Sequence, residues 1–250
     1  MTATLLSVIM PCYNEAKGVG RTLDALEQLR VRLAAQLVQI EIIAVDDGSR
    51  DGTADRLDER AETIPGLKVV RHSVNRGKGA AIRTGREHVT GQFVVFQDAD
   101  MELDPADIPR LIAPLLDGRA DAVLGSRFAR REEHMVRNYW HRLGNAALTT
   151  MSNIFTGLDL TDMETGYKAF TAETFRIMRM TSDRFGMEPE TVARLAQMRA
   201  RVYEVPISYV GRSYAEGKKI TWRDGVEAIW ILFRERLRRV PAAGSPRTAG

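Results

Sequence analysis

The chain has one cysteine, Cys12, and four histidines among its 250 residues. A single cysteine excludes an internal disulfide framework and is typical of a protein from a reducing compartment. The four histidines are scattered, so the sequence shows no zinc-ligand spacing. What the chain does contain is ordinary for a soluble globular protein, namely 44% hydrophobic and 28% charged residues.

Long apolar runs are absent as well. No stretch approaches the roughly 20 apolar residues that span a bilayer. The N-terminus has no basic region followed by an apolar segment, so no signal peptide is predicted. The net charge of +3 favours anionic partners but is too small to distinguish phosphates, nucleic acid and a membrane surface. Residues 241–250 are rich in Pro, Ala, Gly and Ser and are predicted to form a disordered tail.

An acidic cluster directly follows an apolar run. Residues 93–96 are typical of a buried strand, and in an extended backbone Asp98, Asp100 and Glu102 would point to the same side. Three convergent carboxylates repel one another unless a cation lies among them, and magnesium sites commonly combine one or two carboxylates with substrate phosphate. The cluster therefore indicates a nucleotide-diphosphate enzyme. The alternative is an acidic loop that caps a helix beginning near Pro105.

Strand and helix patterns alternate through the first half of the chain. Such alternation predicts an α/β fold with a mixed, mostly parallel, Rossmann-like sheet that helices flank on both faces. In these sheets ligands bind beyond the carboxyl ends of the strands. The predicted strands are 5–10, 40–45, 67–71, 92–97 and 120–124, and the predicted helices are 20–37, 53–61, 79–89 and 105–116. Polar motifs follow four of the strands, at 11–15, 46–49, 98–100 and 125–127, so one site can collect all of them.

The second half has helices with apolar and aromatic stripes. Residues 135–155 carry apolar side chains at helical spacing with Tyr139 and Trp140 at one end, and residues 224–240 hold an apolar core followed by arginines. Aromatic side chains beside arginines suit a membrane interface. The alternative is that both helices pack on the sheet or form a dimer interface. Short strands at 166–170 and 202–209 and a helix at 189–199 complete the prediction.

Seven motifs carry a family resemblance over roughly residues 5–234. They are, in order, Pro11–Glu15, Val45–Ser49 with Asp51–Thr53, Asn75–Gly79, Asp98–Asp100, Gly125–Arg127, Thr165–Phe170 and Arg212–Lys218. The chain resembles the inverting family 2 glycosyltransferases of the GT-A fold, and among them most the dolichyl-phosphate mannose synthase branch. The resemblance implies one catalytic domain over residues 1–240, with a nucleotide-sugar-binding half at 1–128 and an acceptor-binding half at 129–240.

The resemblance also implies how the donor is bound. Asp98 and Asp100 would hold Mg²⁺ or Mn²⁺ against the donor diphosphate. Glu102 stands where this branch often has glutamine, so it is a candidate third metal ligand that makes the site more negative. Glycines on both sides of Lys78 predict a tight turn, with a phosphate contact as the alternative for that lysine. The implied donor-binding residues are Pro11, Tyr13, Glu15, Val45, Asp47, Lys78, Asp98, Ala99 and Asp100.

Arginines are implied to bind the acceptor and to assist catalysis. The implied catalytic residues are Asp98, Asp100, Arg127 and Arg212, and the implied acceptor-binding residues are Arg137, Arg142, Arg212 and Lys218. Spacing does not decide whether Arg137 or Arg142 is the helix arginine that binds the acceptor phosphate. A phosphate acceptor is already anionic near neutral pH, so no general base is required. Direct displacement of an α-linked donor would give a β-linked product.

The sequence therefore predicts a metal-dependent inverting glycosyltransferase that moves a hexose to a polyprenyl (dolichyl or undecaprenyl) phosphate. GDP-mannose is the first donor and UDP-glucose the second. We expect a cytoplasmic protein, peripheral at the inner face of the cell membrane, that binds no nucleic acid; a membrane-anchored partner subunit is a further option. One alternative is the same fold acting on a soluble or glycan hydroxyl, with Glu190 as the discriminating residue. The other is a non-catalytic nucleotide-sugar or lipid-phosphate binding protein.

Overall fold

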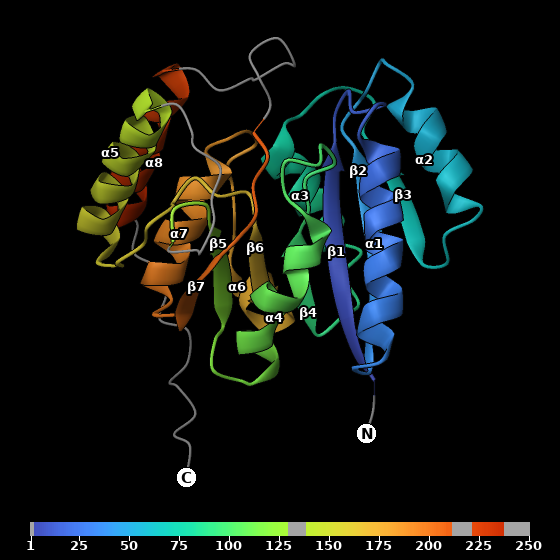
Figure 1. Ribbon diagram of the computed structural model, residues 1–250. Helices are drawn as coiled ribbons and strands as arrows, with labels where there is room; N and C mark the ends of the chain where they lie inside the picture. The colour runs from blue at the N-terminus through green and yellow to red at the C-terminus, as the bar shows by residue number, and fades with distance from the viewer. Residues whose placement is uncertain (1–2, 130–138, 212–221, 238–250) are drawn as a thin grey trace.

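A seven-stranded sheet lies at the centre of the molecule, with helices on both of its faces (Figure 1). The computed structural model describes residues 3–129, 139–211 and 222–237. The elements in chain order are β1 (Thr4–Cys12), α1 (Val19–Ala34), β2 (Val38–Asp46), α2 (Thr53–Ala61), β3 (Leu67–Arg71), α3 (Lys78–Arg86), β4 (Phe93–Phe96), the 3-10 turn η1 (Pro105–Asp107), α4 (Ile108–Leu116), β5 (Ala122–Ser126), α5 (Tyr139–Thr156), β6 (Lys168–Thr171), α6 (Ala172–Ile177), α7 (Met187–Gln197), β7 (Val202–Pro206) and α8 (Trp222–Leu237).

The strand order is β3-β2-β1-β4-β6-β5-β7. β1 pairs in parallel with β2 and β4, β2 with β3, and β5 with β7, which confirms the predicted mostly parallel sheet. β6 alone among the described strands runs antiparallel, to both β4 and β5. Its reversed direction places its first residue, Lys168, at the edge of the sheet where its neighbours end.

The core lies on both faces of the sheet because side chains alternate along each strand. On β1, Leu6, Val8 and Met10 pack with α1 and α4, whereas Ile9 packs on the other face with α3, α6 and α7. All four side chains are fully buried. Burying one such side chain contributes about 1.5–3 kcal/mol, so the sheet faces fix the positions from which the loops extend.

Most helices and strands begin and end close to the positions expected from the sequence. The predicted segments 53–61 and 67–71 coincide with α2 and β3. The short helix α6 was not predicted; it spans six residues, and the Thr171 side chain caps it by accepting a hydrogen bond from the Thr174 backbone N–H.

α5 and α8 lie side by side beyond α7, on the left of Figure 1. α8 buries Ile231 and Leu232 and leaves Trp230 and Phe233 exposed. One side of α8 therefore packs inside the protein, and its other side exposes aromatic side chains to the surface. Within the described residues, no helix is both long enough and apolar enough to cross a membrane.

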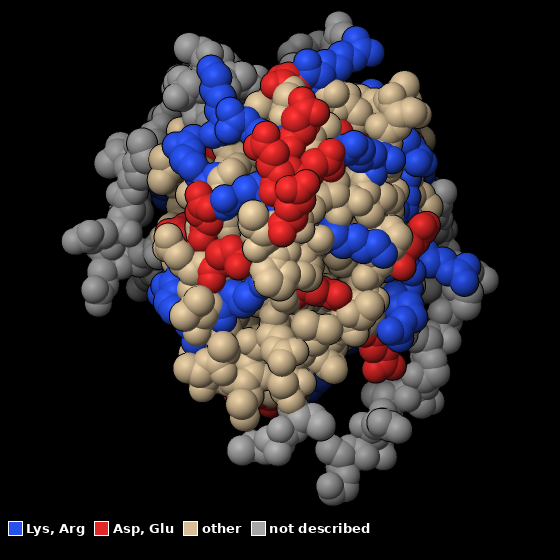
Figure 2. All heavy atoms as spheres, turned by 90° about the vertical axis from the view of Figure 1, so that its right-hand side faces the viewer, with Lys and Arg blue, Asp and Glu red and all other residues tan. Residues whose placement is uncertain are grey.

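The face of the molecule on the side of α2 carries charges of both signs (Figure 2). α2 exposes Asp55, Asp58 and Glu59 together with Arg56. Acidic and basic side chains lie next to one another there, so the small positive net charge is not gathered into a basic surface on this face.

Candidate active site

Loops from four parallel strands meet at one edge of the sheet. β1 leads to Tyr13, β2 to Asp47, β4 to Asp98 and β5 to Arg127, and these strands run in the same direction. The carboxyl ends of parallel strands are where ligands bind in such sheets. The expectation that one edge collects the polar motifs is confirmed.

Hydrogen bonds join the loops after β1 and β2 into one surface. Asn14 has a left-handed backbone, with φ of 56°. Its backbone N–H donates to Ser49 Oγ at 3.0 Å, and its side-chain oxygen accepts from the Arg50 backbone N–H at 2.9 Å. The Glu15 backbone N–H donates to Thr53 Oγ1 at 2.8 Å. The part of the site that Pro11, Tyr13 and Glu15 are expected to form is therefore held by main-chain contacts.

Asp47 fixes the loop that leads into α3. Its carboxylate is almost fully buried and accepts from the backbone N–H groups of Arg76 at 2.8 Å and Gly77 at 2.7 Å. The side chains of Asn75 and His72 approach the same carboxylate at 2.8 and 2.6 Å. Gly77 has φ of 101°, which confirms a tight turn that needs glycine. The implied role of Asp47 in binding the donor stays a prediction.

The backbone after β4 turns, so the three carboxylates do not share one side. Met101 adopts a left-handed conformation with φ of 62°, and Asp100 Oδ1 accepts from the Glu102 backbone N–H at 3.0 Å. Glu102 is directed to Tyr209, whose hydroxyl donates to Glu102 Oε2 at 2.8 Å. The expectation of an extended acidic cluster is wrong because of this turn. Within the described ranges, no group of three or more His, Cys, Asp or Glu side chains could hold a metal ion, so Glu102 as a third ligand is not supported.

Lys78 forms a partly buried ion cluster with two carboxylates. Its Nζ lies 2.8 and 3.0 Å from the two oxygens of Asp98 and 3.4 Å from Glu188 Oε1. Burial alone would lower the pKa of Lys78, but the charges of Asp98 and Glu188 outweigh burial and raise it above its ordinary value. The ammonium therefore stays charged, and Lys78 places a permanent positive charge beside the acidic turn.

Glu188 and Glu190 have different surroundings although both lie in the first turn of α7. Residues two apart on a helix do not face the same way. Glu190 is turned away from Lys78 and accepts from the backbone N–H groups of Thr181 at 2.9 Å and Ser182 at 2.7 Å. The sequence singles out Glu190 as the carboxylate that would discriminate acceptor classes. In the structure Glu188, not Glu190, contacts Lys78, and the role of Glu190 stays a prediction.

Two further charged groups, the buried Lys168 and the half-buried Glu164, interact with this cluster. Lys168 is fully buried and its Nζ donates to the Thr165 carbonyl oxygen. Burial lowers the pKa of Lys168 to about 8, against the opposing charge of Glu188. Burial, with the charge of Glu188, raises the pKa of Glu164 to about 7. The two groups therefore titrate much closer to neutral pH than they would in water.

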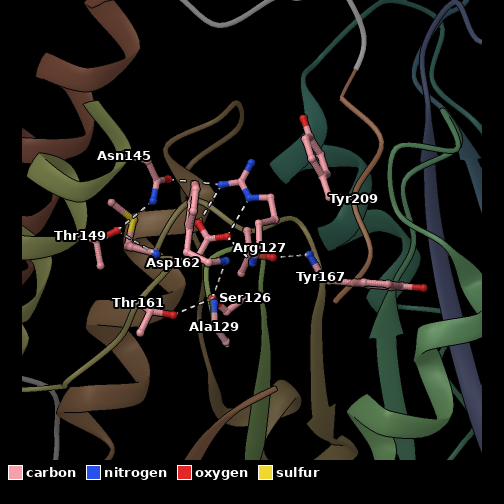
Figure 3. Close-up of polar contacts among 12 residues, drawn as sticks. Ser126, Arg127, Ala129, Asn145, Thr149, Thr161, Asp162, Tyr167 and Tyr209 are labelled. Carbon is pink, nitrogen blue, oxygen red and sulfur yellow. Dashed lines mark hydrogen bonds and ion pairs between the residues drawn. The ribbon is translucent and has the colours of Figure 1, made fainter. Parts of the chain in front are cut away.

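Arg127 is held rigidly by a buried carboxylate (Figure 3). Its Nε and one terminal nitrogen each lie 2.7 Å from an oxygen of Asp162, and its backbone N–H donates to the same carboxylate at 3.0 Å. The Asp162 side chain is fully buried. Burial would lower the pKa of Arg127, but the charge of Asp162 outweighs it and raises that pKa. A paired arginine of this kind presents a planar, fixed cation.

α5 reaches Arg127 through Asn145, whose Oδ1 accepts from the guanidinium at 3.3 Å (Figure 3). Tyr209 lies under the guanidinium from the other side, with 5.2 Å to the ring centre. Arg142 is exposed on α5, three residues before Asn145, and residues three apart are neighbours on a helix surface. Arg142 thus lies on the helix side that contacts Arg127. The other predicted acceptor residues, Arg137, Arg212 and Lys218, lie outside the described residues.

Two predicted donor contacts face the core. Val45 is fully buried in the cluster that packs against α3, and Ala99 is 2% exposed in the cluster that packs against α1. The Ala99 carbonyl oxygen accepts from Thr22 Oγ1 at 3.1 Å. The side chains of both residues are therefore directed inward by strand alternation and by the turn, and a donor contact at Val45 and Ala99 stays a prediction for their backbone atoms.

The acidic turn fits a metal ion that two protein carboxylates share with a ligand. Asp98 and Asp100 are half-buried on one turn, and the Asp98 carboxylate already pairs with a cation, the ammonium group of Lys78. Hard divalent cations bind carboxylate oxygens and take further oxygens from phosphate. The described residues fit Mg²⁺ or Mn²⁺ bound in this way and do not fit a cage of three protein carboxylates.

The sequence did not indicate two residues that shape the site, namely Asp162 and Asn145. Asp162 lies 35 residues from Arg127 and Asn145 lies 18 residues from it. No local sequence pattern predicts contacts between residues this far apart in the chain. A search of the second half for an acidic partner of Arg127 is the one signal that would have pointed to Asp162.

Comparison with known proteins agrees with this geometry. The family model of glycosyl transferase family 2 matches residues 7–185. An undecaprenyl-phosphate mannosyltransferase of Micrococcus luteus is 31% identical over 92% of this chain and 97% of its own length. A dolichyl-phosphate beta-glucosyltransferase of Trichomonas vaginalis is 30% identical over 86% of this chain and 68% of its own length.

Solved structures share the fold. The mannosyl-3-phosphoglycerate synthase of Rubrobacter xylanophilus superposes with a TM-score of 0.71 at 19% identity, covering 95% of this chain and 76% of that one. The glucosyl-3-phosphoglycerate synthase of Mycobacterium tuberculosis, in complex with Mn²⁺, UDP and phosphoglyceric acid, gives 0.69 at 21% identity, covering 96% of this chain and 81% of that one. The predicted GT-A fold is confirmed.

Proposed function

The chain belongs to glycosyl transferase family 2, and on that premise we propose that it transfers a hexose from a nucleotide-diphosphate sugar to a polyprenyl phosphate with inversion. One observation carries the proposal: Arg127, fixed by the buried Asp162, lies at the same sheet edge as the acidic turn of Asp98 and Asp100. A rigid cation beside a metal-binding turn suits two phosphate-bearing substrates.

The donor half, residues 1–128, binds the nucleotide sugar. Pro11, Tyr13 and Glu15 line the base and ribose on the surface that the loops after β1 and β2 form. GDP-mannose is the first candidate and UDP-glucose the second. The names of the relatives support both sugars, since one is a mannosyltransferase and another a glucosyltransferase.

Asp98 and Asp100 hold the divalent cation, Mg²⁺ or Mn²⁺, against the donor diphosphate. When bound, the cation supplies Lewis-acid stabilisation of the charge that develops on the leaving nucleoside diphosphate. Lys78 lies within reach of the same phosphates and adds a second positive charge. These groups also orient the donor so that the face of its anomeric carbon opposite the diphosphate points towards the acceptor.

Two arginines at the border of the two halves meet the lipid phosphate: Arg127, at the end of the donor half, and Arg142, in the acceptor half at residues 129–240. Arg127 can bind phosphate oxygens while Asp162 holds its guanidinium plane, and Arg142 approaches from α5. A phosphate monoester attacks as an anion, so the site needs to neutralise charge and align the oxygen with the sugar carbon. Attack opposite the leaving group inverts the anomeric centre.

The lipid chain calls for a membrane surface, and α8 together with α5 suits one. Trp230 and Phe233 are exposed on α8 with ring centres 6.1 Å apart, and Ile154 is exposed on α5. Arg234 and Arg236 follow on α8 and can meet anionic headgroups. We therefore place the protein at the cytoplasmic face of the membrane as a peripheral enzyme, with or without a membrane-anchored partner subunit.

The test is to incubate the protein with Mn²⁺ or Mg²⁺, labelled GDP-mannose or UDP-glucose, and a short polyprenyl phosphate. Butanol-extractable label that requires the lipid phosphate supports the proposal. A parallel reaction contains a panel of sugars and glycans in place of the lipid phosphate. Label on those hydroxyl acceptors only would overturn it.

A second candidate function is transfer to a hydroxyl, which the position of Glu188 favours. This carboxylate lies in the site and could act as a general base. Its ion pair with Lys78 speaks against that role, because the ammonium already occupies the carboxylate that would have to accept the proton. Glu188→Gln separates the two functions: transfer to a hydroxyl would collapse, whereas transfer to a phosphate would continue.

A further inference from the structure

A lysine ammonium holds the carboxylate to which the proposed metal ion would bind. Lys78 Nζ lies 2.8 Å from Oδ1 and 3.0 Å from Oδ2 of Asp98, so it faces both oxygens at once. An ammonium and a divalent cation have charges of the same sign and bind the same carboxylate oxygens. Their mutual repulsion is strong in a partly buried site. Metal binding to Asp98 therefore requires that Lys78 withdraw.

The surroundings allow the lysine side chain to move but not its backbone. Lys78 is the first residue of α3, and the loop before it is tied to Asp47 through Arg76 and Gly77. Gly166 closes one side of the ion pair: a Cβ there would lie 2.6 Å from Asp98 Oδ2 and 3.1 Å from Lys78 Nζ. The ammonium can leave Asp98 only by rotation of its own side chain.

Glu188 offers the ammonium a second position. Its Oε1 lies 3.4 Å from Lys78 Nζ, and its Oε2 is buried without a hydrogen-bond partner. A buried carboxylate oxygen that lacks a donor costs free energy. That cost is relieved when the ammonium turns from Asp98 towards Glu188.

We propose that Lys78 is a resident counter-ion of Asp98 that makes metal binding depend on the donor. The inference rests on the proposed metal and donor site and adds the order in which that site fills. A nucleoside diphosphate brings negative charge, draws the ammonium towards its own oxygens and Glu188, and so releases Asp98 for the metal ion. Without the diphosphate, the ammonium competes with the metal and keeps its affinity low.

The test is a titration with Mn²⁺ followed by the electron paramagnetic resonance signal of the free ion, with and without GDP or UDP. For the wild type we expect the affinity for Mn²⁺ to be roughly tenfold higher, or more, in the presence of the nucleotide than in its absence. This is a usual size for the coupling between two ligands. Lys78→Met keeps the chain length and removes the charge. It should strengthen the binding of Mn²⁺ alone by roughly tenfold, the effect of removing one nearby like charge.

Two further variants sharpen the test. Glu188→Gln leaves the ammonium with Asp98 as its only carboxylate, so we expect Mn²⁺ affinity in the presence of GDP or UDP to fall while the affinity for Mn²⁺ alone does not rise. Lys68→Met, an exposed lysine on β3, is the matched control and should change neither affinity. Lys78→Gln repeats the removal of charge with a polar side chain, so a folding defect in Lys78→Met does not decide the outcome.

Equal binding of Mn²⁺ alone by the wild type and both Lys78 variants would overturn the counter-ion role and leave the metal site standing. No binding of Mn²⁺ to any of these proteins, even with GDP or UDP, would overturn the metal site as well. The titration needs no acceptor. Failure to transfer sugar to a lipid phosphate would therefore contradict the proposed function without contradicting this inference.

Discussion

The two sides of the site are held in place in different ways. On the donor side, the loops after β1, β2 and β4, carboxylates bind backbone N–H groups of neighbouring loops, as Asp47 does with Arg76 and Gly77. On the acceptor side, the loop after β5 with α5 and α8, Arg127 depends on Asp162 and Asn145 from distant segments. The donor side is thus built by the parallel sheet itself, whereas the acceptor side exists only when the second half of the chain has packed. Each prediction below tests this difference.

The largest expected effect comes from Asp100→Asn on the donor side. Losing one preorganised charge at the site of developing charge lowers kcat by roughly 100- to 1000-fold. The measurement is sugar transfer from GDP-mannose to a short polyprenyl phosphate. Glu59→Gln on the exposed surface of α2 is the control and should transfer at the wild-type rate. Wild-type turnover by Asp100→Asn would show that the acidic turn is not catalytic.

On the acceptor side, Asp162→Asn should lower stability as well as activity. Removing one partner of a buried ion pair costs about 3–5 kcal/mol, and the loosened Arg127 should raise KM for the lipid phosphate more than KM for the donor. Urea unfolding and steady-state kinetics measure the two effects. Asp117→Asn, whose pair with Arg119 is exposed, should leave the urea midpoint almost unchanged. Equal stability losses in both variants would contradict the rigid acceptor side.

Gly166→Ala tests the point where the two sides touch. The added Cβ would lie 2.6 Å from Asp98 Oδ2, so the carboxylate must shift. We expect a loss of donor affinity of roughly tenfold, about 1.4 kcal/mol, with little change in lipid-phosphate KM. Gly20→Ala in α1 meets no atom within 4 Å and is the matched control. Isothermal titration with the nucleotide sugar distinguishes them, and unchanged donor affinity in Gly166→Ala would refute the close approach.

The half-buried Glu164 should make stability depend on pH. Its pKa is about 7 in the folded protein, against 4.5 in its ordinary state. Between these values the folded protein binds a proton that the unfolded chain has released, so stability falls as pH rises from about 4.5 to 7. Glu164→Gln should remove this fall. Urea midpoints measured across that range for both proteins check it, and parallel curves would argue against a protonated Glu164.

The smallest effect concerns the membrane surface on α8. Trp230→Ala should weaken binding to vesicles that contain anionic lipid by roughly three- to tenfold, as expected for losing one interfacial aromatic side chain. Transfer to a short, water-soluble polyprenyl phosphate should not change. Val31→Ala, which removes an exposed apolar side chain from α1, is the control. Vesicle co-sedimentation measures both. Equal binding by Trp230→Ala and the wild type would contradict the proposed contact between α8 and the membrane.

The sequence predicted the donor side of the site more completely than the acceptor side. On the donor side, the strand-end motifs were found in place, because alternating apolar strands and helices allow few arrangements. The inward direction of the Val45 and Ala99 side chains was not predicted, because it depends on strand register and on the left-handed turn at Met101. On the acceptor side, Arg127 was predicted, but its partners were not, since contacts across many residues leave no local pattern.

Local chemistry alone was enough to specify most of the helices and strands, the mostly parallel sheet and the edge at which Asp98 and Arg127 would meet. Folding in three dimensions decided which charges neutralise each other there. The antiparallel insertion of β6 brings Gly166 against Asp98, and α7 brings Glu188, not Glu190, to Lys78. These pairings depend on register and helix rotation, which long-range packing sets, so periodicity along the chain could not reveal them.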